Sequence, residues 1–142
     1  MCRKDESDGP VSENKHDPKG LNPRVLAFVG DGVYSLLVRE RLAVSDCPAG
    51  ALHAESVKMV NAAAQAEAIR RIMELLDFEE QQIYKRGRNA HTGTTPKWVS
   101  EADYHAATGL EALFGWLYLS GKDQRIRALF DVICGKDAQS DF

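Results

Sequence analysis

The sequence predicts an all-α protein, a bundle of helices in a single domain. Apolar residues recur at helical spacing along most of the chain, and a capping residue precedes several of these periodic stretches. No segment shows the strict alternation of a convincing β-strand, and there is no internal repeat. A length of 142 residues suits one domain of this class.

The chain divides into a tail, a domain and a short end. We expect residues 1–20 to be disordered, residues 21–134 to form the helical domain, and residues 135–142 to fray. The first 20 residues mix charges with glycine and proline, and Val11 is their one branched aliphatic residue. Such a segment buries too little apolar surface to offset its chain entropy.

The helices of the domain follow from local signals. Asn22-Pro23 begins a helix to about Ala43, because Asn caps well and Pro loses no hydrogen bond at the first helical position. Residues 51–76 are rich in helix formers and are expected to be helical, with a split at Asn61. Asp77 and Glu80 have capping-box spacing and begin a helix to about Arg86.

The second half of the domain continues the pattern. Two glycines between residues 87 and 95, followed by Pro96, indicate a break. Ser100 caps the next helix, which runs through the apolar stretch Thr108–Ser120. Residues 123–134 then predict a last helix.

The composition is that of an ordinary globular protein, 44% hydrophobic and 27% charged. No apolar run approaches the roughly 20 residues of a membrane span. The first residues lack the apolar core of a secretory signal, and the three cysteines are too scattered for a disulfide framework or a zinc site. We therefore expect a cytoplasmic protein without a membrane partner.

Two acidic residues stand alone in apolar surroundings, Asp31 within Phe28–Tyr34 and Glu111 within Thr108–Ser120. An ionised carboxylate is costly there unless a cation or hydrogen-bond donors face it. We interpret the pair as meeting where two helices cross closely and holding a divalent cation. Mg²⁺ suits such a pair, because it typically binds through one or two carboxylates, waters and substrate phosphates.

Each acid also has an ordinary structural interpretation. Asp31 could cap a helix that restarts after a break at Gly30. Glu111 could complete a capping box that begins at Thr108, although Ser100 already offers an earlier start.

A basic segment precedes the apolar helix. Residues 81–100 hold four of the 18 Lys and Arg residues of the chain and none of its 21 Asp and Glu residues, although the net charge is −3. A localised basic patch matters more for binding a polyanion than the total charge. Basic, amide and hydroxyl side chains suit the phosphates and 2′-hydroxyls of duplex RNA, and the candidate RNA-binding residues are Lys85, Arg86, Arg88, Asn89, Thr94, Thr95 and Lys97. The alternative is a solvated loop whose charges complement a helix C-terminus.

These motifs resemble those of the ribonuclease III family. Residues 28–34 (FVGDGVY) are similar to its Gly-Asp-Ala-Val segment, and residues 110–119 (LEALFGWLYL) to its Glu-Ala-Leu-Ile-Gly segment. Residues 86–97 (RGRNAHTGTTPK) resemble the signature of its short bacterial branch, the Mini-ribonuclease III enzymes. The resemblance covers roughly residues 21–133.

The resemblance implies an all-helical, homodimeric endoribonuclease domain that cleaves double-stranded RNA with Mg²⁺, leaves 5′-phosphate ends and matures the ends of 23S ribosomal RNA precursor. Asp31 and Glu111 match the catalytic, metal-binding acids of the family. We expect the dimer surface to use the apolar face near Phe28 and Val29 and the stretch Leu113–Leu117. Whether a ribosomal protein assists is not decided by the sequence.

The chain departs from full-length ribonuclease III at three positions. Those enzymes carry further acids where this chain has Arg24, Ala27 and Thr108. The departures leave open the number of metal ions. They also leave the alternative of a catalytically inactive ribonuclease III-like module for RNA binding or ribosome assembly. A helical adaptor without an RNA role is disfavoured by the acid-free basic segment.

Overall fold

The computed structural model describes residues 17–90 and 93–135, and within them the protein is all-α, as predicted. The helices are α1 (Pro23–Ala43), α2 (Leu52–Val60), α3 (Ala62–Ile72), α4 (Phe78–Arg88), α5 (Glu101–Leu119) and α6 (Asp123–Ile133), with short 3₁₀ turns η1 (Pro18–Gly20), η2 (Ala49–Ala51) and η3 (Met73–Leu75). The expected tail over residues 1–16 and the expected frayed end over residues 136–142 lie outside the described ranges. None of the helices described combines the length and apolar character that a bilayer crossing requires.

The helix starts follow the predicted caps. The Asn22 side chain accepts a hydrogen bond from the Arg24 N–H at 2.8 Å, and Asn61 accepts one from Ala64 at 2.8 Å, so the expected split at Asn61 is confirmed. Asp77 and Glu80 form the complete capping box at the start of α4. Each cap satisfies a backbone donor that the helix itself leaves unpaired.

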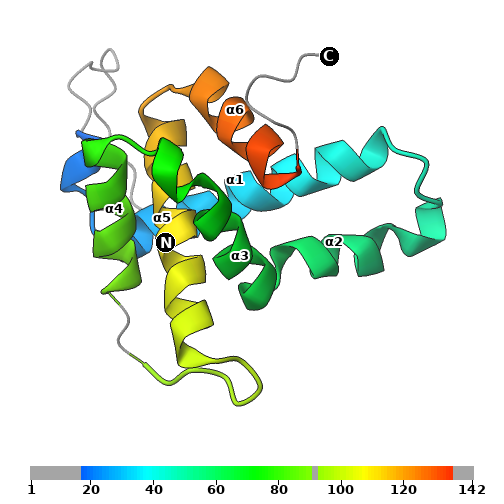
Figure 1. Ribbon diagram of the computed structural model, residues 1–142, viewed down its shortest axis with the longest axis horizontal. Helices are drawn as coiled ribbons and strands as arrows, with labels where there is room; N and C mark the ends of the chain where they lie inside the picture. The colour runs from blue at the N-terminus through cyan, green and yellow to red at the C-terminus, as the bar shows by residue number, and fades with distance from the viewer. Residues whose placement is uncertain (1–16, 91–92, 136–142) are drawn as a thin grey trace, which may run out of the picture.

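Helix α5 is the centre of the bundle, and α1, α3 and α4 pack around it (Figure 1). Its sequence is apolar on most sides, as a helix surrounded by others requires. Every residue of Leu113–Leu117 is buried within the chain. The expectation that this stretch faces a dimer partner is therefore wrong, because the bundle core already covers it.

Glycines allow the two closest crossings of α5. A Cβ on Gly30 of α1 would collide with the Glu111 carbonyl oxygen, and one on Gly115 would collide with the Leu26 carbonyl oxygen. On another side, a Cβ on Gly87 would lie 2.6 Å from the Ala112 Cβ. Gly87 is therefore a packing residue inside α4, which continues to Arg88, two residues beyond its predicted end, and the missing side chain of Gly87 admits α5.

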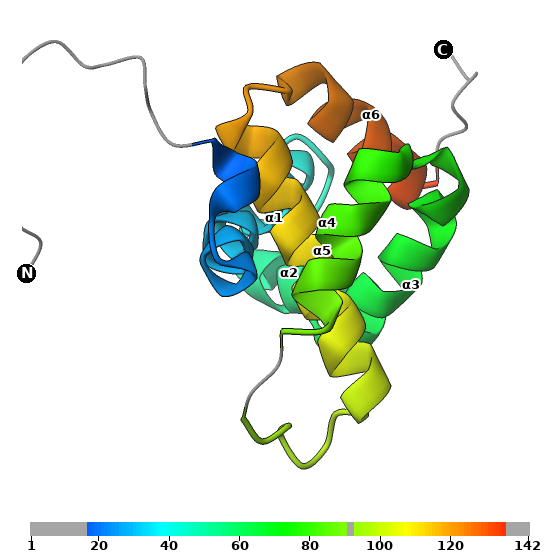
Figure 2. The same cartoon turned by 90° about the vertical axis from the view of Figure 1, so that its left-hand side faces the viewer.

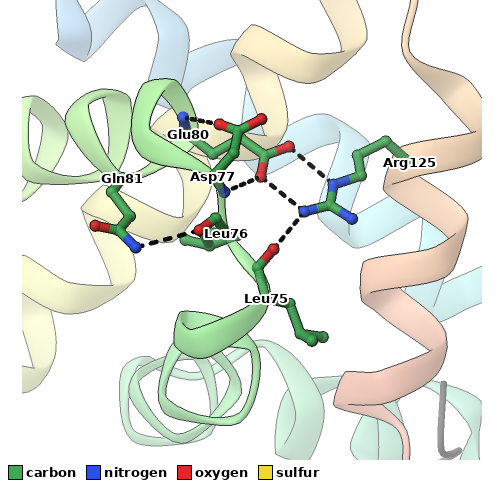
Figure 3. Close-up of polar contacts among 6 residues, drawn as sticks. All are labelled: Leu75, Leu76, Asp77, Glu80, Gln81 and Arg125. Carbon is green, nitrogen blue, oxygen red and sulfur yellow. Dashed lines mark hydrogen bonds and ion pairs between the residues drawn. The ribbon is translucent and has the colours of Figure 1, made fainter.

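Helix α6 is fastened to the start of α4 by Arg125 (Figure 3). The Arg125 guanidinium donates to both carboxylate oxygens of Glu80 at 2.8 Å and to the Leu75 carbonyl at 2.7 Å. Glu80 is only 2% exposed, so its charge is compensated by this cation and by the Asp77 N–H. The contact holds the C-terminal helix against the bundle.

Residues 17–20 differ from the expected disordered tail. Asp17 caps the turn η1, and Lys19 pairs with Glu79 of α4 at 2.7 Å. The Arg86 guanidinium donates to the carbonyl oxygens of Lys19 and Leu21 at 2.9 and 3.1 Å. These polar contacts order a segment that has almost no apolar surface of its own, which composition alone does not reveal.

Candidate active site

Asp31 projects from the middle of α1 and is exposed to solvent. The helix passes through Gly30 and Asp31 without a break, so Asp31 does not cap a helix. Gly30 lies against the backbone of α5, and its neighbour Asp31 is therefore held close to that helix.

Glu111 lies in the interior of α5, ten residues after the first residue of that helix. The α5 cap is Ser100, whose hydroxyl accepts from the Asp103 N–H at 3.0 Å. Thr108 caps nothing, because its hydroxyl donates to the Tyr104 carbonyl at 3.1 Å. Glu111 therefore takes no part in a capping box, and its carboxyl group is free for other partners.

The structure brings the two carboxyl groups together across the α1–α5 crossing. The Glu111 and Asp31 side chains lie within hydrogen-bonding contact of each other. Burial, followed by the negative charge of Asp31, raises the pKa of Glu111 to about 8. The negative charge of Asp31 therefore disfavours ionisation of Glu111, and the two groups share a site at which a second negative charge is costly.

Gln65 of α3 completes this cluster, and the sequence reasoning missed it. Its side chain is 2% exposed and hydrogen-bonds the Glu111 side chain, which lowers the pKa of Glu111 against the effect of burial. The available signal was its spacing, because Gln65 shares the apolar face of α3 with Ile69 and Ile72. A polar residue on an apolar face calls for a buried partner.

The basic residues lie at the end of α4 and in the connection to α5. Lys85, Asn89, Thr94 and Lys97 are exposed, and Thr95 is half-buried with no described partner for its buried hydroxyl oxygen. Residues 93–100 lie at the end of the bundle away from α6 (Figure 2). Because Gly87 packs on Ala112, the last turn of α4 lies against the turn of α5 that carries Glu111.

Arg88 makes local contacts, whereas Arg86 contacts a distant part of the chain. Arg88 lies over the Tyr84 ring at 5.6 Å and donates to the Asn89 side chain at 3.2 Å, both of them local contacts. The Arg86 guanidinium instead donates hydrogen bonds to the Lys19 and Leu21 carbonyl groups, which are distant in sequence. In this structure, Arg86 therefore holds the N-terminal turn η1 against α4.

Comparisons with known proteins show the family of the chain. Residues 24–122 match the Ribonuclease III domain family. The chain is 49% identical over 113 residues to the Mini-ribonuclease 3 of Thermoanaerobacter sp. (strain X514), covering 79% of this chain and 80% of that protein. It is 44% identical over 115 residues to the Mini-ribonuclease 3 of Brevibacillus brevis, covering 80% and 86%.

A solved structure gives the same picture of the fold. The crystal structure of a protein from Fusobacterium nucleatum superposes with a TM-score of 0.76 at 28% identity, covering 84% of this chain and 97% of the other. The matched family segment contains both Asp31 and Glu111. The chain belongs to the ribonuclease III family, the endoribonucleases of double-stranded RNA.

Proposed function

We propose that this endoribonuclease hydrolyses duplex RNA at the Asp31–Glu111 pair with Mg²⁺, and that its cytoplasmic substrate is the precursor of 23S ribosomal RNA. The observation that carries the proposal is the meeting of the exposed Asp31 carboxyl group of α1 with the largely buried Glu111 carboxyl group of α5. Packing alone does not account for two carboxyl groups in contact, because ionisation of the second group is disfavoured while the first is charged. A divalent cation would relieve that repulsion.

The donor chemistry fits such a cation. Among the described residues no group of three or more His, Cys, Asp or Glu side chains forms a metal-ligand cluster, so two carboxylates are what the chain offers here. Mg²⁺ binds readily through one or two carboxylates when waters and substrate phosphates fill the other positions. Members of the ribonuclease III family generally use a divalent metal ion.

The chain's own residues have distinct roles in this scheme. Exposed Asp31 would meet the cation from the solvent side, and Glu111 would meet it from within the bundle. Bound there, Mg²⁺ would neutralise charge at the scissile phosphate and lower the pKa of a water for in-line attack. The products would be 5′-phosphate and 3′-hydroxyl ends.

The basic segment would hold the RNA backbone. Exposed Lys85 and Lys97 and the half-buried Arg88 can approach phosphates, and the exposed Asn89 and Thr94 offer polar groups to 2′-hydroxyls. The contact between the last turn of α4 and the Glu111 turn supports this assignment, because it brings the end of the helix that carries Lys85 and Arg88 to the turn of α5 that carries Glu111.

An apolar face on α1 supports a homodimer. Phe28 is 80% exposed and Leu36 66% exposed, with Val25 and Gly32 along the same side of the helix. Tyr118 of α5 borders a surface hollow that Leu36 also lines. A second copy would bury this face and supply a second site, one for each strand of a duplex.

The decisive experiment compares the wild-type protein with Asp31→Asn and Glu111→Gln on a duplex RNA in Mg²⁺. We expect each variant to lose cleavage by at least about a hundredfold while folding and RNA binding persist, because each removes a negative oxygen ligand. Substantial cleavage by either variant would remove that residue from the mechanism. A wild-type protein that binds duplex RNA but never cuts it, even with ribosomal proteins added, would instead support the inactive RNA-binding module.

A further inference from the structure

Gln65 is an unusual residue for the interior of this bundle. It is among the largest fully buried side chains of the described chain, and the other large ones are aromatic or aliphatic. A buried amide without hydrogen bonds costs about 1–3 kcal/mol. Its presence at this place therefore depends on the partner that it meets.

That partner is the Glu111 side chain. The Gln65 amide N–H₂ is a donor from which a Glu111 carboxyl oxygen can accept, with or without a bound cation. The bond joins the Glu111 side chain to α3, just as its contact with Asp31 joins it to α1. Gln65 therefore helps to set where the Glu111 carboxyl group points.

The framework of α3 holds this amide in place. The Asn61 cap fixes where the helix begins, and Ala66 and Ala68 on either side of the Gln65 position are 1% and 2% exposed. Ile69 lies one turn further along and is 2% exposed. Close packing of this kind leaves a side chain few alternative rotamers, so the amide is pre-oriented toward α5.

We infer that Gln65 is a positioning residue of the metal site, which holds the Glu111 carboxyl group turned toward Asp31 before the cation arrives. This inference rests on the proposed function, because it assigns the Asp31–Glu111 pair to a divalent cation. Groups that hydrogen-bond metal ligands tune metal affinity by about 10–100-fold in well-studied sites. Gln65 has that relation to Glu111.

The test is metal binding by the full chain without RNA. Gln65→Met keeps the size of the side chain and removes the amide, and Gln81→Met is the matched control. Gln81 is a half-buried glutamine near the start of α4 that donates to the Leu76 carbonyl at 3.2 Å (Figure 3), so its described partner is a backbone group and not a carboxylate of the pair. In calorimetric titration with Mn²⁺, we expect Gln65→Met to bind about tenfold or more weakly than wild type, and Gln81→Met to bind as wild type does.

Cleavage provides a second readout. The Mg²⁺ concentration for half-maximal activity should rise by a similar factor in Gln65→Met and stay unchanged in Gln81→Met. Equal Mn²⁺ affinities in wild type and Gln65→Met would overturn the inference and leave the proposed function standing. A wild-type protein that binds no Mn²⁺ and cuts no RNA would overturn both.

The wild-type protein gives an answer even if Gln65→Met fails to fold. In ¹⁵N-labelled protein, the side-chain amide signals of Gln65 should shift on addition of Mg²⁺, because the charge on Glu111 is then shared with the cation. The signals of Gln81 should stay in place. Unshifted Gln65 signals in a sample that binds Mg²⁺ would contradict the assignment.

Discussion

A largely buried carboxyl group beside a second carboxyl group, as Glu111 is beside Asp31, holds its proton more tightly in the folded chain than in the unfolded one. Its pKa is raised from 4.5 to about 8. Between these values the folded protein binds more protons than the unfolded protein. Raising the pH therefore favours unfolding, and the stabilising contribution of protonated Glu111 is lost as the pH rises through about 8.

We predict that the free energy of unfolding of the metal-free protein falls by about 2–4 kcal/mol from pH 5 to pH 8 through Glu111. Glu111→Gln stays uncharged and should lack this part of the fall. Urea unfolding in a chelating buffer at several pH values measures both proteins. The same pH slope in wild type and variant would show that Glu111 titrates normally, and Mg²⁺ should flatten the wild-type slope by favouring the ionised form.

Single residues also mark the limit of what the sequence predicts. The lone acids Asp31 and Glu111 were found because charges in apolar surroundings need partners. Gln65 was not, since a glutamine in an Ala-rich helix is ordinarily at the surface. The contacts of Arg86 with two backbone carbonyl groups, 65 and 67 residues away in the chain, leave no trace in local sequence.

At the scale of the helices, the starts were predictable and one end was not. Asn22, Asn61, Asp77 and Ser100 act within one turn, so the sequence nearby contains the whole signal. Gly87 could be a helix breaker or a packing residue, and only its contact with Ala112 decides. The crossing of α1 and α5 was anticipated from the small residues near each acid, because close backbones need them.

The α1–α5 crossing itself can be tested with one methyl group. Gly30→Ala places a Cβ against the Glu111 carbonyl, and backbone has to move, so we predict a loss of about 3 kcal/mol or more in unfolding free energy. Cleavage should fall as well, because the two carboxylates separate. Gly32→Ala is the control on the same helix, where a Cβ meets nothing within the chain. Because Gly32 lies on the proposed dimer face, both variants are compared at concentrations at which the chain is monomeric, and there Gly32→Ala should stabilise by up to about 1 kcal/mol. Similar unfolding midpoints for the two variants would contradict the crossing.

The segment between α4 and α5 should separate RNA binding from stability. In a Glu111→Gln background, replacing Arg88 and Lys97 with Gln should weaken duplex binding and reduce its salt slope by about 1 for each phosphate contact removed. Arg86→Gln should instead lower the melting temperature, because it releases the Lys19 and Leu21 carbonyl groups. Gel shifts over a range of salt and a thermal melt measure the two effects. An unchanged salt slope of RNA binding in the double variant would show that the segment is a solvated loop.

At the scale of the whole molecule, one chain presents one carboxylate pair, whereas a duplex has two strands. An unpaired apolar face lies on α1, the same helix that carries Asp31, and Leu113–Leu117 is excluded from it by burial. Exposed apolar side chains gathered along one helix are characteristic of a protein interface. Two copies joined through α1 would hold their sites in a fixed relation across the RNA.

The predicted dimer interface can be tested by the same substitution at two phenylalanines that are similarly exposed. Phe28→Asp places a charge in the α1 face, and we expect it to sediment as a monomer at micromolar concentration and to nick duplex RNA instead of cutting both strands together. Phe78→Asp makes the same change at a residue of α4 that is 75% exposed, against 80% for Phe28, and should remain dimeric. Because both side chains are already in water in the single chain, neither substitution removes core packing. A wild-type monomer that cuts both strands in one event would exclude the paired-site arrangement, and equal behaviour of the two variants would move the interface away from α1.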